Sequence, residues 1–289
     1  MTGTLPAEFT VAWSGSIGEH TLTILDVVGP DWLANTAALY RELRTATDEP
    51  IDENLFADLD IVNIDDVRAR YLRTQIPQRA GGNFAVVRSD LAEVLMGYLG
   101  EQLHGYLYGY RSTRDRELIQ ITGRGIDQIG VSAIEDADGQ PKFVLMLGEA
   151  KVSADQHTPP AVVDALDDSL RNQHLYHLAD RDTLIAKVTS ASRRARGHAF
   201  VVFQAVLALL ESESLDQLHV HSASLLVRPL GLGAVTDFGS FKDTPDHFLP
   251  GRVDFVIVRT DSANIETTID SFHAIASAPA GSISTEETP

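Results

Sequence analysis

The sequence predicts a mixed α/β protein, in which helices flank one central sheet of both parallel and antiparallel strands. Apolar runs with the alternation of β-strands are interspersed with longer segments that carry apolar residues at helical spacing. From residue 81 onward the predicted order is a helix, two strands, two helices, two further strands and a last helix. That order suits a mixed sheet covered by helices.

Length and composition are those of an ordinary globular protein. The 289 residues can form one large or two modest domains, and 44% of them are hydrophobic. The first residues have neither the basic nor the apolar part of a signal peptide, and the longest nearly apolar run, residues 199–210, is shorter than the roughly 20 residues that a bilayer requires. We therefore expect no membrane contact and assign the chain to the cytoplasm by default. The absence of cysteine excludes disulfides and thiolate zinc sites.

The first 80 residues are expected to form an N-terminal α/β region. In chain order its predicted elements are a hairpin of residues 9–13 and 20–28, a helix over 31–44, a loop over 47–54 and a helix over 65–75. The glycine-containing segment 78–83 is the best candidate for a boundary. No residue before it carries recognisable chemistry, so packing and partner binding both stay open as roles.

The most informative stretch is the apolar run from residue 143 to residue 152. As a strand, it sends alternate residues to opposite faces, so Leu147, Glu149 and Lys151 share one face. A row of core-facing side chains thus ends in a carboxylate and an ammonium, which is expected where a sheet meets a cleft or open water.

A second apolar run, residues 126–131, carries Asp127. Between the two runs, residues 136–139 (Asp-Ala-Asp-Gly) supply turn chemistry, so the strands most simply pair as a long antiparallel hairpin. Such pairing would place Asp127 beside Glu149.

Two carboxylates at one point repel each other unless a cation lies between them. Mg²⁺ suits that position because it prefers oxygen ligands and keeps waters that can act on a phosphate, and Mn²⁺ can take its place. Lys151 would stabilise the charge that grows on phosphorus or orient the attacking water. Asp127, Glu149 and Lys151 therefore predict a metal-dependent phosphodiesterase site.

These residues resemble the signature of the PD-(D/E)XK nuclease superfamily, an Asp on one strand followed by Glu-x-Lys on the next. The matching segments are Gly125-Ile126-Asp127 and Gly148-Glu149-Ala150-Lys151, and the resemblance extends over residues 88–260. It implies a restriction-endonuclease-like core within residues 81–276. Asp127 and Glu149 would be the metal ligands of that core, and Lys151 a catalytic residue.

The superfamily often adds a Glu from a preceding helix, which implies Glu93 as a third catalytic and metal-binding residue. Glu93 lies in a helix predicted over residues 89–104. An alternative role is structural, because Asp90-Leu-Ala-Glu93 has the spacing of a capping box at the start of that helix. Lys151 likewise has a structural alternative, an ion pair with Asp127 or Glu149 at the end of the sheet.

More narrowly, the order of an acidic helix, a Gly-x-Asp strand and a Leu-Gly-Glu-x-Lys strand is similar to that of the HamA family, the nuclease subunits of Hachiman anti-phage systems. The resemblance implies an antiviral effector that cuts DNA and works with a separately encoded, HamB-like helicase subunit. The chain contains no Gly-x4-Gly-Lys-Ser/Thr motif, so any ATP-driven motor would have to be that partner.

The rest of the chain is expected to complete the sheet and its helices. The predicted elements are helices over 161–178, 198–210 and 264–276, strands over 218–227 and 252–259, and a disordered tail over 277–289. The first of these helices carries Gln173 and Tyr176, reminiscent of a Gln and a Tyr on the corresponding helix of some PD-(D/E)XK nucleases. His219 and His221 share a strand face, but a metal site there lacks an evident third ligand.

The net charge of −18 is the main objection to a nucleic-acid enzyme, because such a surface repels a polyanion. Basic residues gather locally, before the site at Arg111, Arg114, Arg116 and Arg124 and after it at Arg193, Arg194 and Arg196. They would line a groove or simply be solvated. A catalytically inactive module that binds a basic protein, and a nuclease that acts on RNA, are therefore kept as alternatives.

Overall fold

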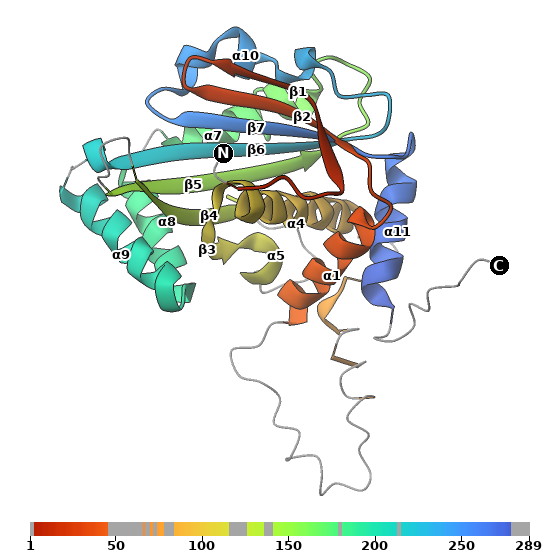
Figure 1. Ribbon diagram of the computed structural model, residues 1–289, viewed down its shortest axis with the longest axis horizontal. Helices are drawn as coiled ribbons and strands as arrows, with labels where there is room; N and C mark the ends of the chain where they lie inside the picture. The colour runs from red at the N-terminus through yellow and green to blue at the C-terminus, as the bar shows by residue number, and fades with distance from the viewer. Residues whose placement is uncertain are drawn as a thin grey trace, which may run out of the picture.

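A seven-stranded mixed sheet runs through the described part of the computed structural model, which comprises residues 3–45, 66, 70–71, 74–77, 84–115, 126–135, 141–178, 181–212 and 215–278. The strand order is β1-β2-β7-β6-β5-β4-β3 (Figure 1). The strands are β1 (Phe9–Ile17), β2 (His20–Val27), β3 (Leu107–Arg111), β4 (Gln128–Glu135), β5 (Pro141–Val152), β6 (Leu218–Arg228) and β7 (Arg252–Arg259).

Parallel strands form the middle of the sheet, and antiparallel pairs form its two edges. β2, β7, β6 and β5 pair in parallel in that order. The antiparallel pairs are β1 with β2 at one edge, and β5 with β4 and β4 with β3 at the other. The predicted mixed sheet is therefore confirmed. Because β2 pairs with β7, the described strands of the N-terminal region belong to the same sheet as the predicted site.

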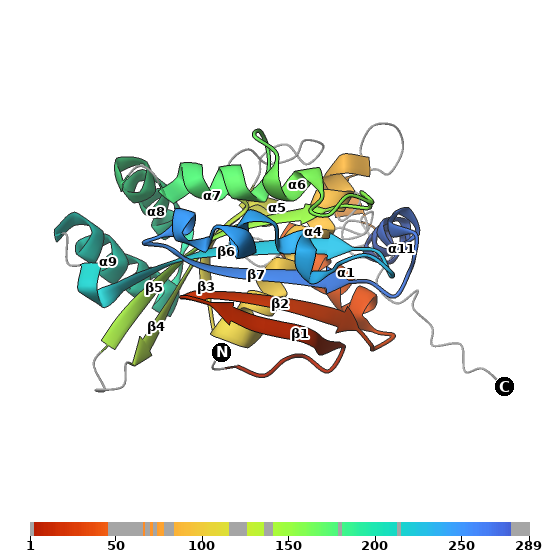
Figure 2. The same cartoon turned by 90° about the horizontal axis from the view of Figure 1, so that it is seen from above.

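Helices cover both faces of the sheet (Figure 2). On one face lie α1 (Trp32–Thr45), α4 (Phe84–His104) and α11 (Ile265–Ser277), and on the other lie α6 (Ala161–Asp164), α7 (Leu170–Leu178), α8 (Arg181–Arg194) and α9 (Gly197–Ser212). Shorter turns of helix are α5 (Ser112–Asp115), α10 (Ser240–Asp243) and the 3-10 segments Leu215–Gln217, Val235–Phe238 and Pro245–Phe248. Among the described residues, no helix has the length and apolar character that crossing a bilayer demands.

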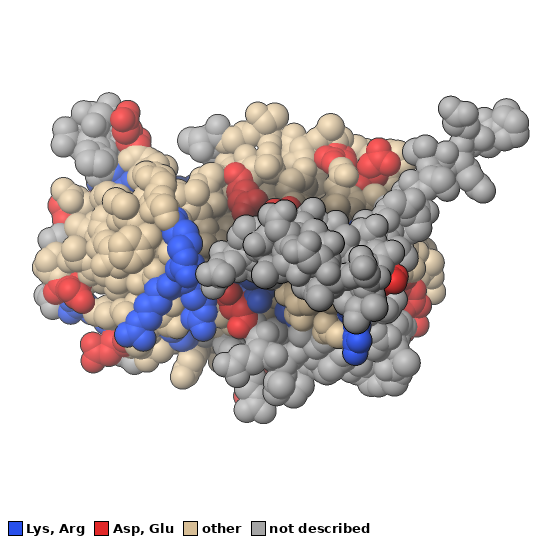
Figure 3. Space-filling model, turned by 90° about the horizontal axis from the view of Figure 1, so that it is seen from below, with Lys and Arg blue, Asp and Glu red and all other residues tan. Residues whose placement is uncertain are grey.

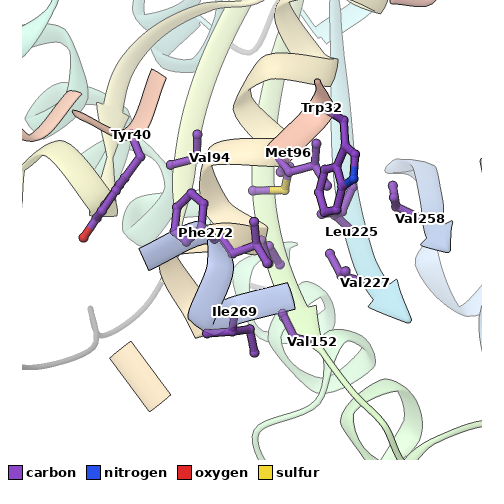
Figure 4. Close-up of a cluster of buried hydrophobic side chains, with 14 of the residues drawn as sticks. Trp32, Tyr40, Val94, Met96, Val152, Leu225, Val227, Val258, Ile269 and Phe272 are labelled. Carbon is purple, nitrogen blue, oxygen red and sulfur yellow. The ribbon is translucent and has the colours of Figure 1, made fainter. Parts of the chain in front are cut away.

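Strand alternation divides the apolar core between the two faces. Ala150 and Val152 of β5 pack with Trp32 and Phe272 of the first helical layer (Figure 4). Leu145 and Leu147, which have the opposite parity, pack with α8 and α9. Glu149 and Lys151 continue this second row, as the sequence predicts.

Several sequence predictions match the structure in position and type. These are the first hairpin, the helix at α1, the antiparallel pair β4 and β5, the strands β6 and β7, the helix α9 and the last helix, α11. The expectation that α9 is largely buried is wrong: only one face packs on the sheet, and Phe200 and Val201 are exposed. The described residues of the helix predicted over 65–75, namely 66, 70, 71, 74 and 75, are helical. The predicted loop 47–54, boundary 78–83, turn 136–139 and residues 279–289 of the predicted tail lie outside the described residues.

Two predicted helices differ from those found. The helix predicted from Ser89 begins at Phe84, and Asp90 is buried inside it, where its carboxylate accepts a hydrogen bond of 2.7 Å from the Tyr40 hydroxyl. The helix predicted over 161–178 is interrupted, because Ala165 is extended and Asp168 is left-handed, with φ of 49°. Sequence reasoning also missed β3 and α8.

Candidate active site

The pairing of β4 with β5 places Asp127 beside Glu149. Gln128 lies opposite Gly148, and the Asp127 amide, one residue before β4, donates to the Gly148 carbonyl at 3.0 Å. The Asp127 carboxylate in turn accepts a hydrogen bond of 2.9 Å from the Ala150 amide. These hydrogen bonds fix the Asp127 side chain against β5, next to Glu149, as the sequence predicts.

Glu93 approaches the same point from α4. Its two carboxylate oxygens accept hydrogen bonds from the Ser89 hydroxyl at 2.8 Å and the Thr113 hydroxyl at 2.6 Å. The Gln128 amide group donates to the backbone carbonyl of Glu93. The capping-box interpretation is wrong, because α4 begins well before Asp90 and the Glu93 side chain binds hydroxyls rather than the start of the helix.

The three carboxylates are almost completely withdrawn from water. The exposed fraction is 6% for Asp127, 3% for Glu149 and 1% for Glu93. Burial raises the pKa of Asp127 well above its usual value, and the charges of Glu149 and Glu93 raise it further. Burial also raises the pKa of Glu149 to about 7, although Lys151 opposes that shift.

Lys151 contributes the positive charge of the cluster. Its ammonium lies 3.2 Å from Glu149 Oε1 and 2.9 Å from Asp168 Oδ1. Burial alone would lower the pKa of Lys151, but Glu149 and Asp168 outweigh burial and the pKa is raised. Lys151 is therefore cationic at neutral pH.

The Lys151–Glu149 ion pair is the structural alternative that the sequence left open, yet it does not account for the whole cluster. A purely structural ion pair would balance its charges and satisfy its hydrogen bonds. Here, among the described residues, Asp127 and Glu93 add two further buried carboxylates beside the single ammonium of Lys151. An arrangement with this excess of negative charge is suited to binding a cation.

The predicted Gln and Tyr of α7 lie at the opening of the cluster. Gln173 donates a hydrogen bond of 2.9 Å to Asp168, the residue that also binds Lys151. Tyr176 is exposed, and the Lys187 ammonium of α8 lies 5.5 Å from the centre of its ring. Burial lowers the pKa of Lys187 and the charge of Glu149 opposes this, which places Lys187 within electrostatic reach of the site.

Sequence reasoning missed several residues of this cluster. Thr113, Asp168 and Lys187 were assigned no part in it. The pair Asp167-Asp168 ahead of a helix was a visible signal, but nothing in the sequence connected it with Lys151, because the contact depends on the interruption between α6 and α7.

The predicted basic groups fare differently. Arg111 is buried and pairs with Glu101, and Arg114 pairs with the adjacent Asp115, so neither is solvated charge. Arg116 and Arg124 lie outside the described residues. After the site, Arg194 of α8 is exposed and lies 5.7 Å from the ring of Tyr110, a residue whose pKa burial, Glu93 and Asp127 all raise. Figure 3 shows Lys and Arg side chains gathered in a band on one face of the molecule.

The residues present fit a magnesium ion bound by two carboxylates. In the described ranges of the chain, no three His, Asp or Glu side chains are arranged to hold a metal. Mg²⁺ is commonly held by one or two carboxylates together with water and substrate phosphates. Asp127 and Glu149 could supply those two carboxylates, because the charge of each already acts on the other. His221, the other predicted candidate, instead shares a hydrogen bond of 2.9 Å with Tyr106.

Comparison of the sequence with models of known protein families and with curated proteins finds no match.

Proposed function

We propose that this protein is a Mg²⁺-dependent nuclease with a PD-(D/E)XK-type active site. One observation carries the proposal: Asp127, Glu149 and Lys151 meet at one point, where the described residues place three buried carboxylates around the single ammonium of Lys151. Perturbed carboxylate pKa values of this kind are typical of functional sites. The succession of Glu93 on α4, Asp127 before β4 and Glu-x-Lys on β5 also agrees with the order of that superfamily.

Each residue has a role that its contacts allow. Asp127 and Glu149 would hold the ion, and the Ala150 amide keeps the Asp127 carboxylate in place. Lys151 would stabilise the charge that develops on phosphorus, because its ammonium is cationic and stands beside Glu149. Glu93 would bind or orient water, since each carboxylate oxygen can accept a second hydrogen bond beyond those from Ser89 and Thr113. The metal would supply a polarised phosphate and an activated water.

DNA cleaved as part of an anti-phage defence is the biological role that we propose, with a HamB-like helicase as partner. The net charge of −18, which opposes DNA binding by the surface as a whole, is compatible with this division of labour. A helicase partner would supply much of the binding and deliver the strand to the site.

The decisive experiment replaces Glu149 by Gln and Lys151 by Met, each close in size to the native residue. Both variants should lose Mg²⁺-dependent cleavage of DNA, by about 100-fold or more, while far-UV circular dichroism and the unfolding transition show an intact fold. The assay should include the helicase partner, and RNA should be offered as a second substrate.

Matched controls lie at the far end of the same two strands. Glu135 on β4 is exposed, and Lys142 on β5 donates a hydrogen bond to the backbone carbonyl of Asp216. Glu135→Gln and Lys142→Met make the same chemical changes away from the cluster and should cleave like the wild type. Unchanged cleavage in both site variants would refute the proposal.

A catalytically inactive module is the second candidate, favoured by the ion pairs that occupy Lys151 in the structure. Such a module would use its acidic surface on a basic protein and would have no need of a metal at Asp127 and Glu149. Calorimetric titration with Mg²⁺ or Mn²⁺ separates the two. The nuclease should bind metal and lose that binding in Asp127→Asn, whereas the module should bind none.

A further inference from the structure

Asp168 lies on the solvent side of the proposed active site. Its Oδ1 atom accepts two hydrogen bonds, from the Lys151 ammonium at 2.9 Å and from the Gln173 amide at 2.9 Å. The side chain itself is 82% exposed, although the Lys151 it binds leads directly to buried Glu149. An anionic oxygen therefore sits at the boundary between solvent and the carboxylate cluster.

The position of Asp168 is fixed by its neighbours. Its φ of 49° lies in the left-handed region, which costs free energy for residues other than glycine and is tolerated best by Asn and Asp. Ser169, the next residue, is fully buried and caps α7, since its hydroxyl accepts from the Asn172 amide at 3.1 Å and donates to the Ala165 carbonyl at 2.6 Å.

Stability gives no adequate reason for an acid at this place. An ion pair as exposed as Asp168–Lys151 contributes about 0–1 kcal/mol. The Asp168 charge also raises the pKa of Glu149, so it adds negative charge to a site that already has an excess. What the contact does accomplish is to hold Lys151 and Gln173 on one oxygen.

Carboxylate and phosphate oxygens are recognised by the same donors, ammonium and amide N–H groups. We infer that the space between Lys151 and Gln173 is a phosphate subsite, in which the Asp168 carboxylate stands in for a phosphate group of the nucleic-acid substrate. Binding of a strand then exchanges one anion for another on the same two donors. Asp168 competes with the substrate and keeps Lys151 covered in its absence.

The inference rests on the proposed nuclease function for the identity of its ligand, but it can be tested without cleavage. The experiment measures the affinity of a short fluorescent DNA oligonucleotide for the full chain in the presence of EDTA. Asp168→Asn removes the negative charge and retains a residue that tolerates the left-handed conformation. It should bind about two- to fivefold more tightly than the wild type, the range expected for losing an exposed ion pair that competes with the ligand.

Asp167→Asn is the matched control, because it removes the same charge from the exposed neighbouring residue. It should change the affinity less than Asp168→Asn does. Asp168→Gly, which is freer still in the left-handed region, should reproduce the gain. In a Lys151→Met background, Asp168→Asn should raise the oligonucleotide affinity no more than Asp167→Asn does, because the donor for which phosphate and Asp168 compete is gone.

Equal affinities in Asp168→Asn and Asp167→Asn, or no oligonucleotide binding by any variant, would overturn the subsite. Inorganic phosphate gives an independent readout: with the oligonucleotide kept well below its Kd, half-displacement from Asp168→Asn should need less phosphate than from Asp167→Asn. Tighter binding by Asp168→Asn without cleavage by the wild type would refute the nuclease and retain the subsite. Cleavage by the wild type, with equal affinities in Asp168→Asn and Asp167→Asn, would retain the nuclease and refute the subsite.

Discussion

Two ionic clusters on neighbouring strands, one around Arg228 and one around Glu149, differ in their balance of charge. At the end of β6, Arg228 and Asp237 are each 1% exposed. Every guanidinium nitrogen of Arg228 has an acceptor: Asp237 at 3.1 Å, the Ser153 carbonyl at 2.9 Å and the Asp155 carbonyl at 2.7 Å. In the proposed active site, one partly buried ammonium, that of Lys151, faces three buried carboxylates. A buried carboxylate oxygen without a hydrogen-bond partner among the described residues occurs in both clusters, on Asp237 and on Glu149, so the clusters differ in their balance of charge.

The contrast separates a structural ion pair from a functional one. Around Arg228 the charges cancel and the hydrogen bonds tie β6 to the segment that follows β5, so the cluster can serve stability alone. Around Glu149 the charges do not cancel, and each carboxylate makes its neighbour harder to ionise. A folded protein tolerates that cost where the excess charge binds something, and the nuclease that we propose would bind a divalent cation there.

The largest expected effect on stability belongs to the balanced cluster. Arg228→Met leaves Asp237 buried without its counter-charge, and it should lower the free energy of unfolding by about 3–5 kcal/mol. Urea denaturation measures the loss. Arg259, which lies opposite Arg228 on β7, is the matched control: it forms two hydrogen bonds with Asp26 near the surface, and its loss should cost about 1 kcal/mol or less. Equal losses in the two variants would contradict the distinction drawn here.

The next largest expected effect is on the pH dependence of stability, where removing the Glu149 charge should stabilise the protein at high pH. Folding raises the pKa of Glu149 from about 4.5 to about 7, so the folded state holds this proton more tightly than the unfolded state. The associated stability is fully present below pH 4.5 and is lost as the pH rises through 7, by up to about 3 kcal/mol. Asp127 shifts in the same direction, and the two groups titrate as a pair with Glu93, Lys151 and Asp168 around them.

The metal-free wild type should therefore melt several degrees lower at pH 8 than at pH 5.5. In Glu149→Gln the melting temperature should depend less on pH, and this variant should be more stable than the wild type at pH 8. Millimolar Mg²⁺ should raise the melting temperature of the wild type at pH 8 and have little effect on Glu149→Gln. Differential scanning fluorimetry over this pH range is sufficient. Glu135→Gln should keep the wild-type dependence of melting temperature on pH. If Glu149→Gln kept it as well, ionisation of Glu149 would not be what destabilises the folded protein at high pH.

How much of this could be predicted from the sequence depends on the range of the interactions. Strand alternation placed Glu149 and Lys151 on one face, and antiparallel pairing across a short turn placed Asp127 beside them, because both are local rules. The interruption between α6 and α7 has no such rule. It depends on an extended Ala165 and a left-handed Asp168, and the contact of Asp168 with Lys151 follows from it.

Contacts between segments that are distant in the sequence could not be predicted either. Asp90 has the spacing of a helix cap, but it lies inside α4 because the Tyr40 hydroxyl from another helix satisfies it. α8 was missed because its buried residues, Leu184, Val188 and Ala191 among them, form a narrow stripe in an otherwise polar helix. Lys187 on that helix consequently had no place in the predicted site.

The smallest expected effect decides whether Glu93 belongs to the functional cluster. Thr113→Val keeps the shape of the side chain and removes the hydroxyl that donates to Glu93 Oε2. Loss of a hydrogen bond to a buried carboxylate should cost about 1–2 kcal/mol of stability in either case. If Glu93 positions water, kcat should also fall by about tenfold with KM unchanged, because the carboxylate would turn away from the reacting atoms.

Thr113→Ser restores the hydroxyl and should recover kcat, whereas Ser89→Ala, which removes the partly buried partner of Oε1, should have a weaker effect. A Thr113→Val enzyme that is destabilised but fully active would assign Glu93 to packing. The functional cluster would then consist of two carboxylates and one ammonium, and its contrast with Arg228 would rest on Asp127 and Glu149 alone.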